Sequence, residues 1–249
     1  MKTVLITGCS SGFGRDTASY FLAQGWNVIA TMRIPNEDIL PKSDKLRLIK
    51  LDVTDDASVA AAIKDAGKID VLVNNAGIGW LNAVEGTSME VVRQIFETNT
   101  FGTIAMTKAV LPQFRAQGSG VIINVTSSVT LKPLHLLSVY TASKAAINGF
   151  TESMALELEP FNIQARIVLP GRAPTTQFGE NARALMSKEG GFPDAYGELV
   201  QQVFANFEQE SPDMVTQSDD VAKAIWRAAT DPSCPVRLPA GADAVALSS

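Results

Sequence analysis

Short apolar segments alternate along the chain with longer segments in which apolar residues recur at helical spacing. The short segments are rich in Val, Ile and Leu, which is typical of strands buried on both faces of a parallel sheet. They comprise Val4–Thr7, Trp26–Thr31, Leu46–Leu51, Ile69–Asn74, Val121–Thr126 and Ile163–Leu169. The longer segments predict helices at Phe13–Gln24, Asp56–Ala66, Met89–Glu97, Thr103–Gln117 and Val139–Leu158.

The repeated order of strand, helix and strand predicts right-handed crossovers between parallel strands. The expected fold class is therefore α/β: a Rossmann-type doubly wound parallel sheet in a three-layer α/β/α sandwich. Asp55 or Asp56 and Ser88 stand where helix N-caps are expected, and Gly67 and Gly118 stand where helices would end.

One segment departs from this alternation. Residues 175–216, called the lid segment below, are rich in Gly, Glu, Gln and Phe and contain the breaker Gly190-Gly191-Phe192-Pro193. A long insertion after the sixth strand is usually a lid or a binding loop, with surface packing or an oligomer contact as the alternative. No linker or repeat occurs elsewhere, so residues 1–249 are expected to form one domain, with a last edge strand near Val236–Leu238.

Composition excludes several classes of function. The chain has 249 residues, 46% of them hydrophobic, and a net charge of −5, which disfavours nucleic acid and anionic membranes as partners. Two cysteines and one histidine, His135, leave no disulfide framework and no metal site to expect. No run approaches the ~18 apolar residues of a membrane span, and no signal peptide is recognisable, so we expect a cytoplasmic protein.

A glycine-rich turn follows the first predicted strand and opens the first predicted helix. Its glycines follow a G-x-x-x-G-x-G pattern, which permits a tight turn and brings backbone N–H groups at a helix N-terminus close to a pyrophosphate. The expected cofactor-binding residues of this turn are Gly8, Ser10, Ser11, Gly12, Phe13 and Gly14.

The end of the second strand predicts which dinucleotide binds. An acid that holds the adenosine ribose hydroxyls is expected there, about 20 residues after the turn. The sequence has Met32, which cannot accept a hydrogen bond from ribose, and Arg33, whose cation suits a 2′-phosphate. We therefore predict NADP(H) rather than NAD(H), with Ser10 or Ser11 and Arg15 assisting; the alternative is that Arg33 is a solvated strand end.

Tyr140 and Lys144 are four residues apart in a predicted helix and so share one face. A free tyrosine has a pKa near ~10, too high for a general base at neutral pH. A nearby ammonium group and an oxidised nicotinamide would both favour the phenolate and lower that pKa. By itself such a pair is more often a solvated helix face.

Further motifs, taken in their order along the chain, favour a functional role for Tyr140 and Lys144. Asn74-Asn75-Ala76-Gly77 ends the fourth strand, Asn99 lies in Glu97-Thr98-Asn99-Thr100, Ser127-Ser128 ends the fifth strand, and Pro170-Gly171 ends the sixth. With the turn at residues 7–14, this set resembles the short-chain dehydrogenase/reductase family, in its compact group of about 250 residues, over nearly the whole chain. The turn and the end of the second strand resemble those of hydroxysteroid and retinol dehydrogenases.

The resemblance implies roles for individual residues. Tyr140 would be the general acid/base, Lys144 would lower its pKa and hold the nicotinamide ribose, and Asn99 would support a water through which protons reach Lys144. A serine would hydrogen-bond the substrate oxygen. Further cofactor contacts would come from Asp52, Val53, Asn75, Ala76, Gly77, Pro170, Gly171 and Thr175.

Two serines compete for the catalytic role. The family spacing of 13 positions before the tyrosine selects Ser127, whereas matching the end of the strand selects Ser128 with a loop one residue short. Neighbouring strand residues point to opposite faces, so only one can face the cleft. Because deletions are easier in loops than in strands, the sequence favours Ser128.

The sequence thus predicts an NADP(H)-dependent enzyme that interconverts a carbonyl and an alcohol on a moderately apolar small molecule. The family habit implies a homodimer or homotetramer. A non-catalytic dinucleotide-binding regulator or scaffold, or an epimerase or dehydratase of the same fold, are the alternatives. His135 and Cys9 are expected to have structural rather than catalytic roles.

Overall fold

The computed structural model describes residues 1–174, 176–209, 211 and 214–248. Its strands are β1 (Thr3–Thr7), β2 (Asn27–Met32), β3 (Leu46–Lys50), β4 (Val71–Asn74), β5 (Gly120–Val125), β6 (Ile163–Pro170) and β7 (Arg237–Ala240). Its helices are α1 (Gly12–Ala23), α2 (Asp56–Ala66), α3 (Met89–Phe96), α4 (Gly102–Gln117), α5 (Ser138–Leu158), α6 (Gln177–Lys188), α7 (Gly197–Gln209), α8 (Ser218–Thr230) and α9 (Ala242–Ser248).

The described strands form one parallel sheet in the order β3-β2-β1-β4-β5-β6-β7, which confirms the predicted fold class. The order reverses between β1 and β4. In such sheets ligands bind beyond the carboxyl ends of the strands at the reversal point, and the glycine-rich turn follows β1 there.

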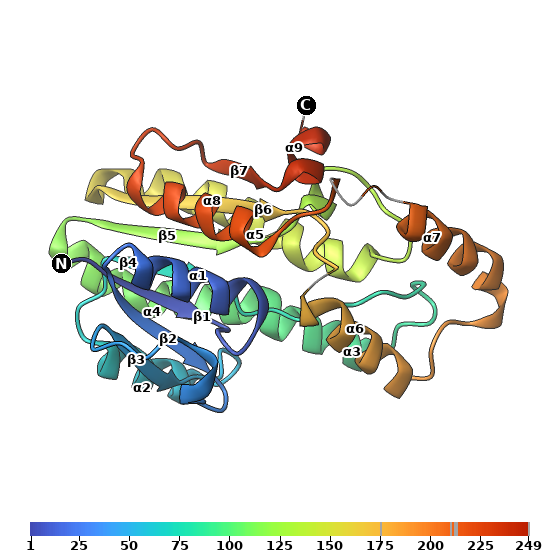
Figure 1. Ribbon diagram of the computed structural model, residues 1–249, viewed down its shortest axis with the longest axis horizontal. Coiled ribbons are helices and arrows are strands. Elements are labelled where there is room, and N and C mark those ends of the chain that lie inside the picture. The colour runs from blue at the N-terminus through green and yellow to red at the C-terminus, as the bar shows by residue number, and fades with distance from the viewer. Residues whose placement is uncertain (175, 210, 212–213, 249) are drawn as a thin grey trace.

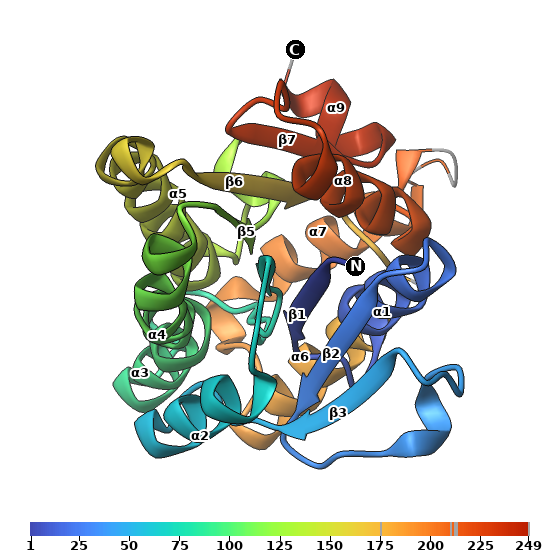
Figure 2. The same ribbon diagram turned by 90° about the vertical axis from the view of Figure 1, so that its left-hand side faces the viewer.

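Helices cover the two faces of the sheet (Figures 1 and 2). α1 and α8 pack on one face and α2, α4 and α5 on the other. The central strands contribute residues to both faces, and Leu5, Ile6 and Leu72 are fully buried. Continuous apolar runs fit this burial on both sides, as the sequence pattern predicted.

Local signals place the helix boundaries. Asp55 and Ser88 cap α2 and α3 through hydrogen bonds from Ala57 N and Val91 N, and α4 ends at Gly118 in the left-handed conformation. Both caps were expected. The edge strand at the C-terminus is also present, shifted slightly to Arg237–Ala240.

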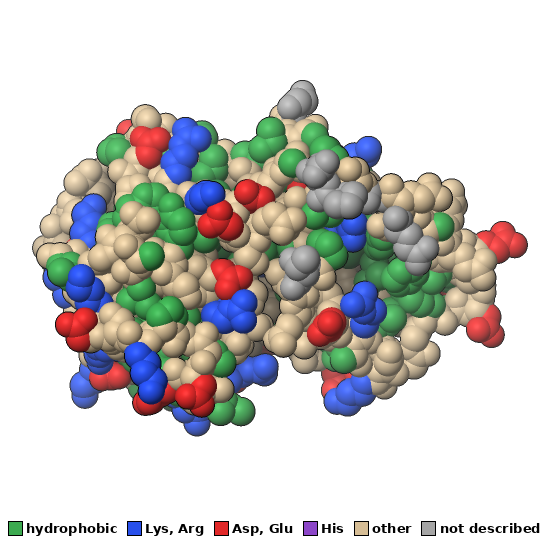
Figure 3. Space-filling view, viewed as in Figure 1, with side chains coloured by type: hydrophobic (Ala, Val, Ile, Leu, Met, Phe, Trp, Pro, Cys, Tyr) green, Lys and Arg blue, Asp and Glu red, His purple; other side chains and the backbone are tan. Residues whose placement is uncertain are grey.

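The lid segment contains α6 and α7, which together lie beyond the carboxyl end of the sheet (Figure 1). In the space-filling view, hydrophobic side chains gather on the lobe at the right of the molecule, where these helices lie (Figure 3). Sequence reasoning identified the segment but assigned no helices to it, because its glycine breakers masked the amphipathic pattern of the flanking residues.

Candidate active site and dinucleotide site

The turn after β1 is built so that only glycine fits at three positions. Gly8 has φ +74° and lies against Ala76, and Gly12 has φ +54°. A Cβ on Gly14 would collide with the carbonyl oxygen of Gly8. These contacts bring the chain into a tight turn directly before α1.

The N-terminus of α1 is suited to bind an anion. The first N–H groups of a helix have no partner within the helix. The Ser11 side chain makes no capping hydrogen bond, and the first turn of α1 holds no acidic residue. A pyrophosphate therefore fits this end of the helix and the turn in front of it.

The end of β4 holds the turn in place. Asn75 Nδ2 donates to the carbonyl oxygens of Thr7 (2.9 Å) and Gly8 (3.2 Å), and Thr7 Oγ1 accepts from the N–H groups of Asn75 and Ala76. The expected cofactor residues Gly8, Gly14, Asn75 and Ala76 thus form one connected unit at the reversal point of the sheet.

Arg33, Asp52 and Val53 lie along the same edge of the sheet. Arg33 is exposed and directly follows β2. Asp52 Oδ1 accepts from Thr54 N (3.0 Å) and Thr54 Oγ1 (2.8 Å). These hydrogen bonds lower the pKa of Asp52, and the positive charge of Arg33 contributes a smaller part. Arg33 therefore stands close enough to Asp52 for their charges to interact.

Asn99 lies in a single π-helical turn, Glu97–Phe101, between α3 and α4. Its Oδ1 accepts from Ile78 N (2.8 Å), and its Nδ2 donates to Ile78 O (2.9 Å) and Ser143 Oγ (3.1 Å). The sequence identified this asparagine, but its π-helical setting carries no signal in the sequence. Such turns are frequent at functional sites.

The side chain of Lys144 points from α5 toward the region around Asn99. Its Nζ donates to Val125 O (3.0 Å) and lies 6.0 Å from the centre of the Tyr140 ring. A Cβ on Gly77 would stand 3.2 Å from Asn99 Oδ1 and 3.4 Å from Lys144 Nζ. The structure therefore brings together Gly77, Asn99, Tyr140 and Lys144, as expected from the sequence.

The pKa values of this pair differ from the sequence expectation. Burial raises the pKa of Tyr140, and the hydrogen bond with Ser127 offsets only part of this effect. Burial lowers the pKa of Lys144 from 10.5 to about 8. The ammonium group alone therefore does not activate the phenol in the protein without its cofactor, because burial dominates.

Lys144 has a consequence for stability that can be measured. A lysine whose pKa falls to about 8 on folding costs the folded state about 3 kcal/mol, at about 1.36 kcal/mol per pKa unit. We expect Lys144→Met to raise the free energy of unfolding of the cofactor-free protein at pH 7 by about 2 kcal/mol, since the unpaired Val125 carbonyl removes about 1 kcal/mol of the gain.

The pH dependence of this effect follows from the linkage between proton binding and folding. The penalty is fully present below pH 8 and is relieved as the pH rises from about 8 toward 10.5, because only the unfolded chain still binds the proton there. Urea unfolding at pH 7, 8, 9 and 10 should show the advantage of Lys144→Met shrinking. A constant difference across this range would contradict the buried, destabilised ammonium.

Ser127 and Ser128 stand in different settings after β5. The Ser127 side chain lowers the pKa of Tyr140 and therefore lies close to the phenol. Ser127 has extended backbone (φ −172°, ψ 152°) directly after β5, whereas Ser128 already begins the 3-10 turn Ser128–Thr130. The extended backbone therefore continues through Ser127 and ends before Ser128.

The lid segment packs over Tyr140. The ring of Phe178 in α6 lies 5.8 Å from the ring of Tyr140, and Leu185 and Met186 join the cluster around Trp80 and Ile95. Tyr140 is consequently only 7% exposed. Sequence reasoning missed Phe178 and Trp80; an aromatic residue alone gives no signal that distinguishes a site wall from core.

A second apolar cluster stands beside the first. It is centred on Ala83, Leu136 and Val203, with lid residues packed around it. Leu136 is buried although its backbone is left-handed (φ 62°). Phe192, Tyr196 and Phe207 pack against this cluster, and the ring of Phe204 lies edge-on to those of Phe192 and Phe207.

The remaining expected cofactor residues are spread around this region. Pro170 ends β6, and Gly171 follows it. Phe13 is half-buried against the core, and Ser10 is exposed. Thr175 lies outside the described residues; its neighbour Thr176 is buried near Gly12. Cys9 is fully buried and burial raises its pKa to about 12, which suits a structural role.

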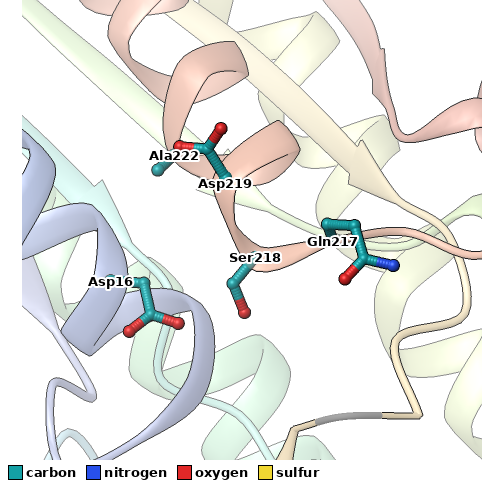
Figure 4. A pocket seen from close by; sticks show the side chains of 5 residues that line it. All are labelled: Asp16, Gln217, Ser218, Asp219 and Ala222. Carbon is teal, nitrogen blue, oxygen red and sulfur yellow. The ribbon is translucent and has the colours of Figure 1, made fainter.

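A separate depression of about 330 Å³ lies between α1 and the start of α8 (Figure 4). Asp16 faces Ser218 and Asp219 across it. Both carboxylates are paired, Asp16 with Arg15 at 2.9 Å and Asp219 with Lys223 at 2.5 Å. In the described part of the chain, no group of three or more His, Cys, Asp or Glu could hold a metal ion, and no helix is long and apolar enough to cross a membrane.

Residues 2–185 match the family model described as short chain dehydrogenase. The chain belongs to the short chain dehydrogenase family. It is 37% identical to the uncharacterized oxidoreductase YusZ of Bacillus subtilis over 243 residues, which cover 92% of this chain and 85% of that protein. It is 35% identical to retinol dehydrogenase 8 of Bos taurus over 257 residues, covering 95% and 80%. The resemblance seen in the sequence is therefore confirmed.

Solved structures of the family share the fold. A short-chain dehydrogenase from Streptomyces avermitilis has a TM-score of 0.83 and 34% identity, covering 100% of this chain and 92% of its own. Serine dehydrogenase with NADP+ (TM-score 0.79, 27% identity, 95% and 93% covered) and 3-ketoacyl-(acyl-carrier-protein) reductase from Brucella melitensis with NADH (0.80, 27%, 97% and 97%) bind different dinucleotides. A nicotinamide dinucleotide is therefore the cofactor class of these relatives.

Proposed function

We propose that the protein catalyses reversible hydride transfer between NADP(H) and a carbonyl/alcohol pair on a moderately apolar small molecule. The observation that carries this proposal is the convergence of Ser127, Tyr140, Lys144 and Asn99 beside Gly77 at the carboxyl edge of the sheet. A scaffold would have no need to bring these four groups together.

The dinucleotide, when bound, would supply or accept the hydride. In this proposal Tyr140 donates a proton to the substrate oxygen during reduction and takes one during oxidation. The Ser127 hydroxyl, which lies close enough to Tyr140 to lower its pKa, would donate to the same oxygen and stabilise its developing charge. The positive charge of Lys144, together with that of an oxidised nicotinamide, would favour the phenolate.

Asn99 would support the water through which protons reach Lys144. Both ends of its side chain are bonded to Ile78, and its Nδ2 also reaches Ser143, so its orientation is fixed. The role proposed for it is to support a water between the backbone and Lys144, with Gly77 leaving the needed space.

The substrate is proposed to be apolar because the lid side of Tyr140 is apolar. Phe178, Leu185 and Met186 approach from α6, and Trp80 and Ile95 join them in the same cluster. A retinol dehydrogenase among the relatives agrees with this chemistry. The lid segment is proposed to close over the substrate and exclude water.

The preference for NADP(H) is proposed from Arg33. Its side chain is exposed just after β2, at the edge of the sheet that continues from the phosphate turn. We expect the wild-type protein to favour NADPH, and Arg33→Ala to lower kcat/KM for NADPH by about 10- to 100-fold, the loss of one or two charge-assisted hydrogen bonds, with little change for NADH.

Steady-state kinetics with both cofactors would measure this preference. Arg47→Ala is the matched control, because Arg47 lies on β3 and pairs with Asp65 away from the turn. A wild-type preference for NADH, or an equal loss with both cofactors, would remove Arg33 as the selecting residue.

The alternatives are separated by one assay. A regulator or scaffold would bind the dinucleotide without turnover, and an epimerase or dehydratase would show no net oxidation of added NADPH. Screening ketones, aldehydes, steroids, retinoids and acyl thioesters for NADPH oxidation would therefore test the reaction class and identify substrates together.

A homodimer or homotetramer through α4 and α5 is part of the proposal. Leu156 on α5 is 74% exposed and Phe101, at the start of α4, is 53% exposed, which suits an interface that covers them. A cytoplasmic location is proposed as well, because Cys9 and Cys234 are both buried free thiols.

A further inference from the structure

One buried carboxylate lies outside the catalytic group. Asp243, near the start of α9, is 8% exposed. Its Oδ2 accepts from Arg172 N (2.6 Å) and its Oδ1 accepts from Thr216 Oγ1 (2.7 Å). A buried carboxylate is retained at low cost only where donors satisfy it, and here the donors come from two segments far apart in sequence.

Two glycines lie against Asp243 and Thr216, where a side chain would not fit. A Cβ on Gly171 would collide with both oxygens of Asp243, and a Cβ on Gly241 would collide with Thr216 Oγ1. Gly241 also has φ +101°, a conformation that side chains rarely adopt. Both glycines are therefore required for Asp243 to reach Arg172 and Thr216.

The two donors stand at the two ends of the lid. Arg172 follows β6 just before the lid segment, and Thr216 is its last residue. They also bond each other, Thr216 N donating to Arg172 O at 2.8 Å, and Thr216 Oγ1 accepts from Gly171 N at 3.0 Å. The lid thus begins and ends at one point, where Asp243 lies.

Arg172 extends this connection into α7. Its Nη2 donates to Phe207 O (3.3 Å), and its guanidinium lies 5.2 Å from the centre of the Phe207 ring. Asp243 fixes the backbone of Arg172, and the Arg172 side chain contacts α7. A path of contacts therefore runs from α9 to the helix that packs over the apolar cluster around Leu136.

We infer that Asp243 is a positioning residue, whose carboxylate holds the two ends of the lid together so that α6 and α7 stay seated over Tyr140. The inference rests on the proposed function, in which the lid segment closes over the substrate. Losing the carboxylate would loosen both ends at once, because each of them donates to it.

Trypsin cleavage of the full-length protein tests the positioning without any substrate. Arg183 and Lys188 are exposed in α6 and provide sites within the lid. We expect Asp243→Ala to raise the rate of cleavage there by about tenfold or more, since each lost charge-assisted bond favours local opening to that extent. Cleavage at sites outside residues 172–216 should not change.

Asp243→Asn is the rescue variant. Its amide oxygen can accept from Arg172 N while its NH₂ group donates to Thr216 Oγ1, which can then donate to Ala240 O, 3.0 Å away. Lid cleavage in this variant should stay near the wild-type rate. Asp231→Asn, in an exposed loop before β7, is the control and should leave the lid unaffected.

A kinetic measurement relates the lid to the reaction. With a substrate from the NADPH screen, Asp243→Ala should raise KM for the carbonyl substrate by about tenfold or more with a smaller effect on kcat, and Asp243→Asn should restore most of it. A purely structural role would lower the midpoint of thermal unfolding but leave KM unchanged in the folded protein.

The outcomes separate the two proposals. If Asp243→Ala does not fold, Thr216→Val replaces it, since it removes one of the two donors with little change in shape. Wild-type lid cleavage in the folded variant would overturn the positioning role whatever the protein catalyses. Faster lid cleavage without any NADPH oxidation in the wild type would keep the positioning role and overturn the oxidoreductase.

Discussion

Tyr140→Phe should lower kcat by about 10²–10⁴-fold, the range typical for loss of a general acid/base. The substitution removes one oxygen from a buried side chain and leaves the ring packed against Phe178. The Ser127 hydroxyl then loses its partner but can turn to the substrate. We therefore expect the loss in kcat rather than in cofactor affinity.

The measurement is NADPH oxidation with a substrate from the screen, together with NADPH binding followed by fluorescence. Tyr20→Phe is the matched control, because Tyr20 lies on α1 against Trp226, on the other face of the sheet. Full turnover by the Tyr140→Phe variant would remove Tyr140 from the mechanism, and with it the proposed reaction.

Ser127→Ala should lower kcat by about 10²–10³-fold, as for removal of one donor to a developing oxyanion. The Ser127 side chain lowers the pKa of Tyr140, so it lies where a substrate oxygen could be shared between the two hydroxyl groups. Its removal should leave the fold intact, since Ser127 Oγ otherwise accepts only a 3.3 Å bond from Val129 N among the described residues.

Ser128→Ala is the control in the same turn. Because Ser128 belongs to the turn Ser128–Thr130, its loss should change kcat by no more than a few fold. The reverse result, a large loss at Ser128 and a small one at Ser127, would assign the catalytic role to Ser128, as the match at the strand end suggested, and remove it from Ser127.

The pKa values bear on when the site becomes active. Burial raises the pKa of Tyr140 and lowers that of Lys144 to about 8, so the protein alone holds a neutral phenol. In the proposed mechanism, an oxidised nicotinamide would supply a second positive charge that favours the phenolate.

Much of the fold could be predicted from the sequence. Parallel strands that are buried on both faces have continuous apolar runs, and in the helices between them the apolar residues recur at helical spacing. The glycines of the turn and the caps at Asp55 and Ser88 could also be identified from the sequence, because each residue type meets a requirement of the local backbone. The spacing of Tyr140 and Lys144 puts them on one face of a helix, but their proposed roles come from the resemblance of the ordered motifs to the family.

Other features arise from residues distant in sequence, and only the tertiary structure decided them. The setting of Ser127 depends on where the extended backbone ends, and Phe178 reaches Tyr140 from a helix that the pattern did not predict. Asp243 meets Arg172 and Thr216 only because β6 and β7 lie side by side. The local conformational preferences of the residues do not predict such contacts, because the packing of the whole chain determines them.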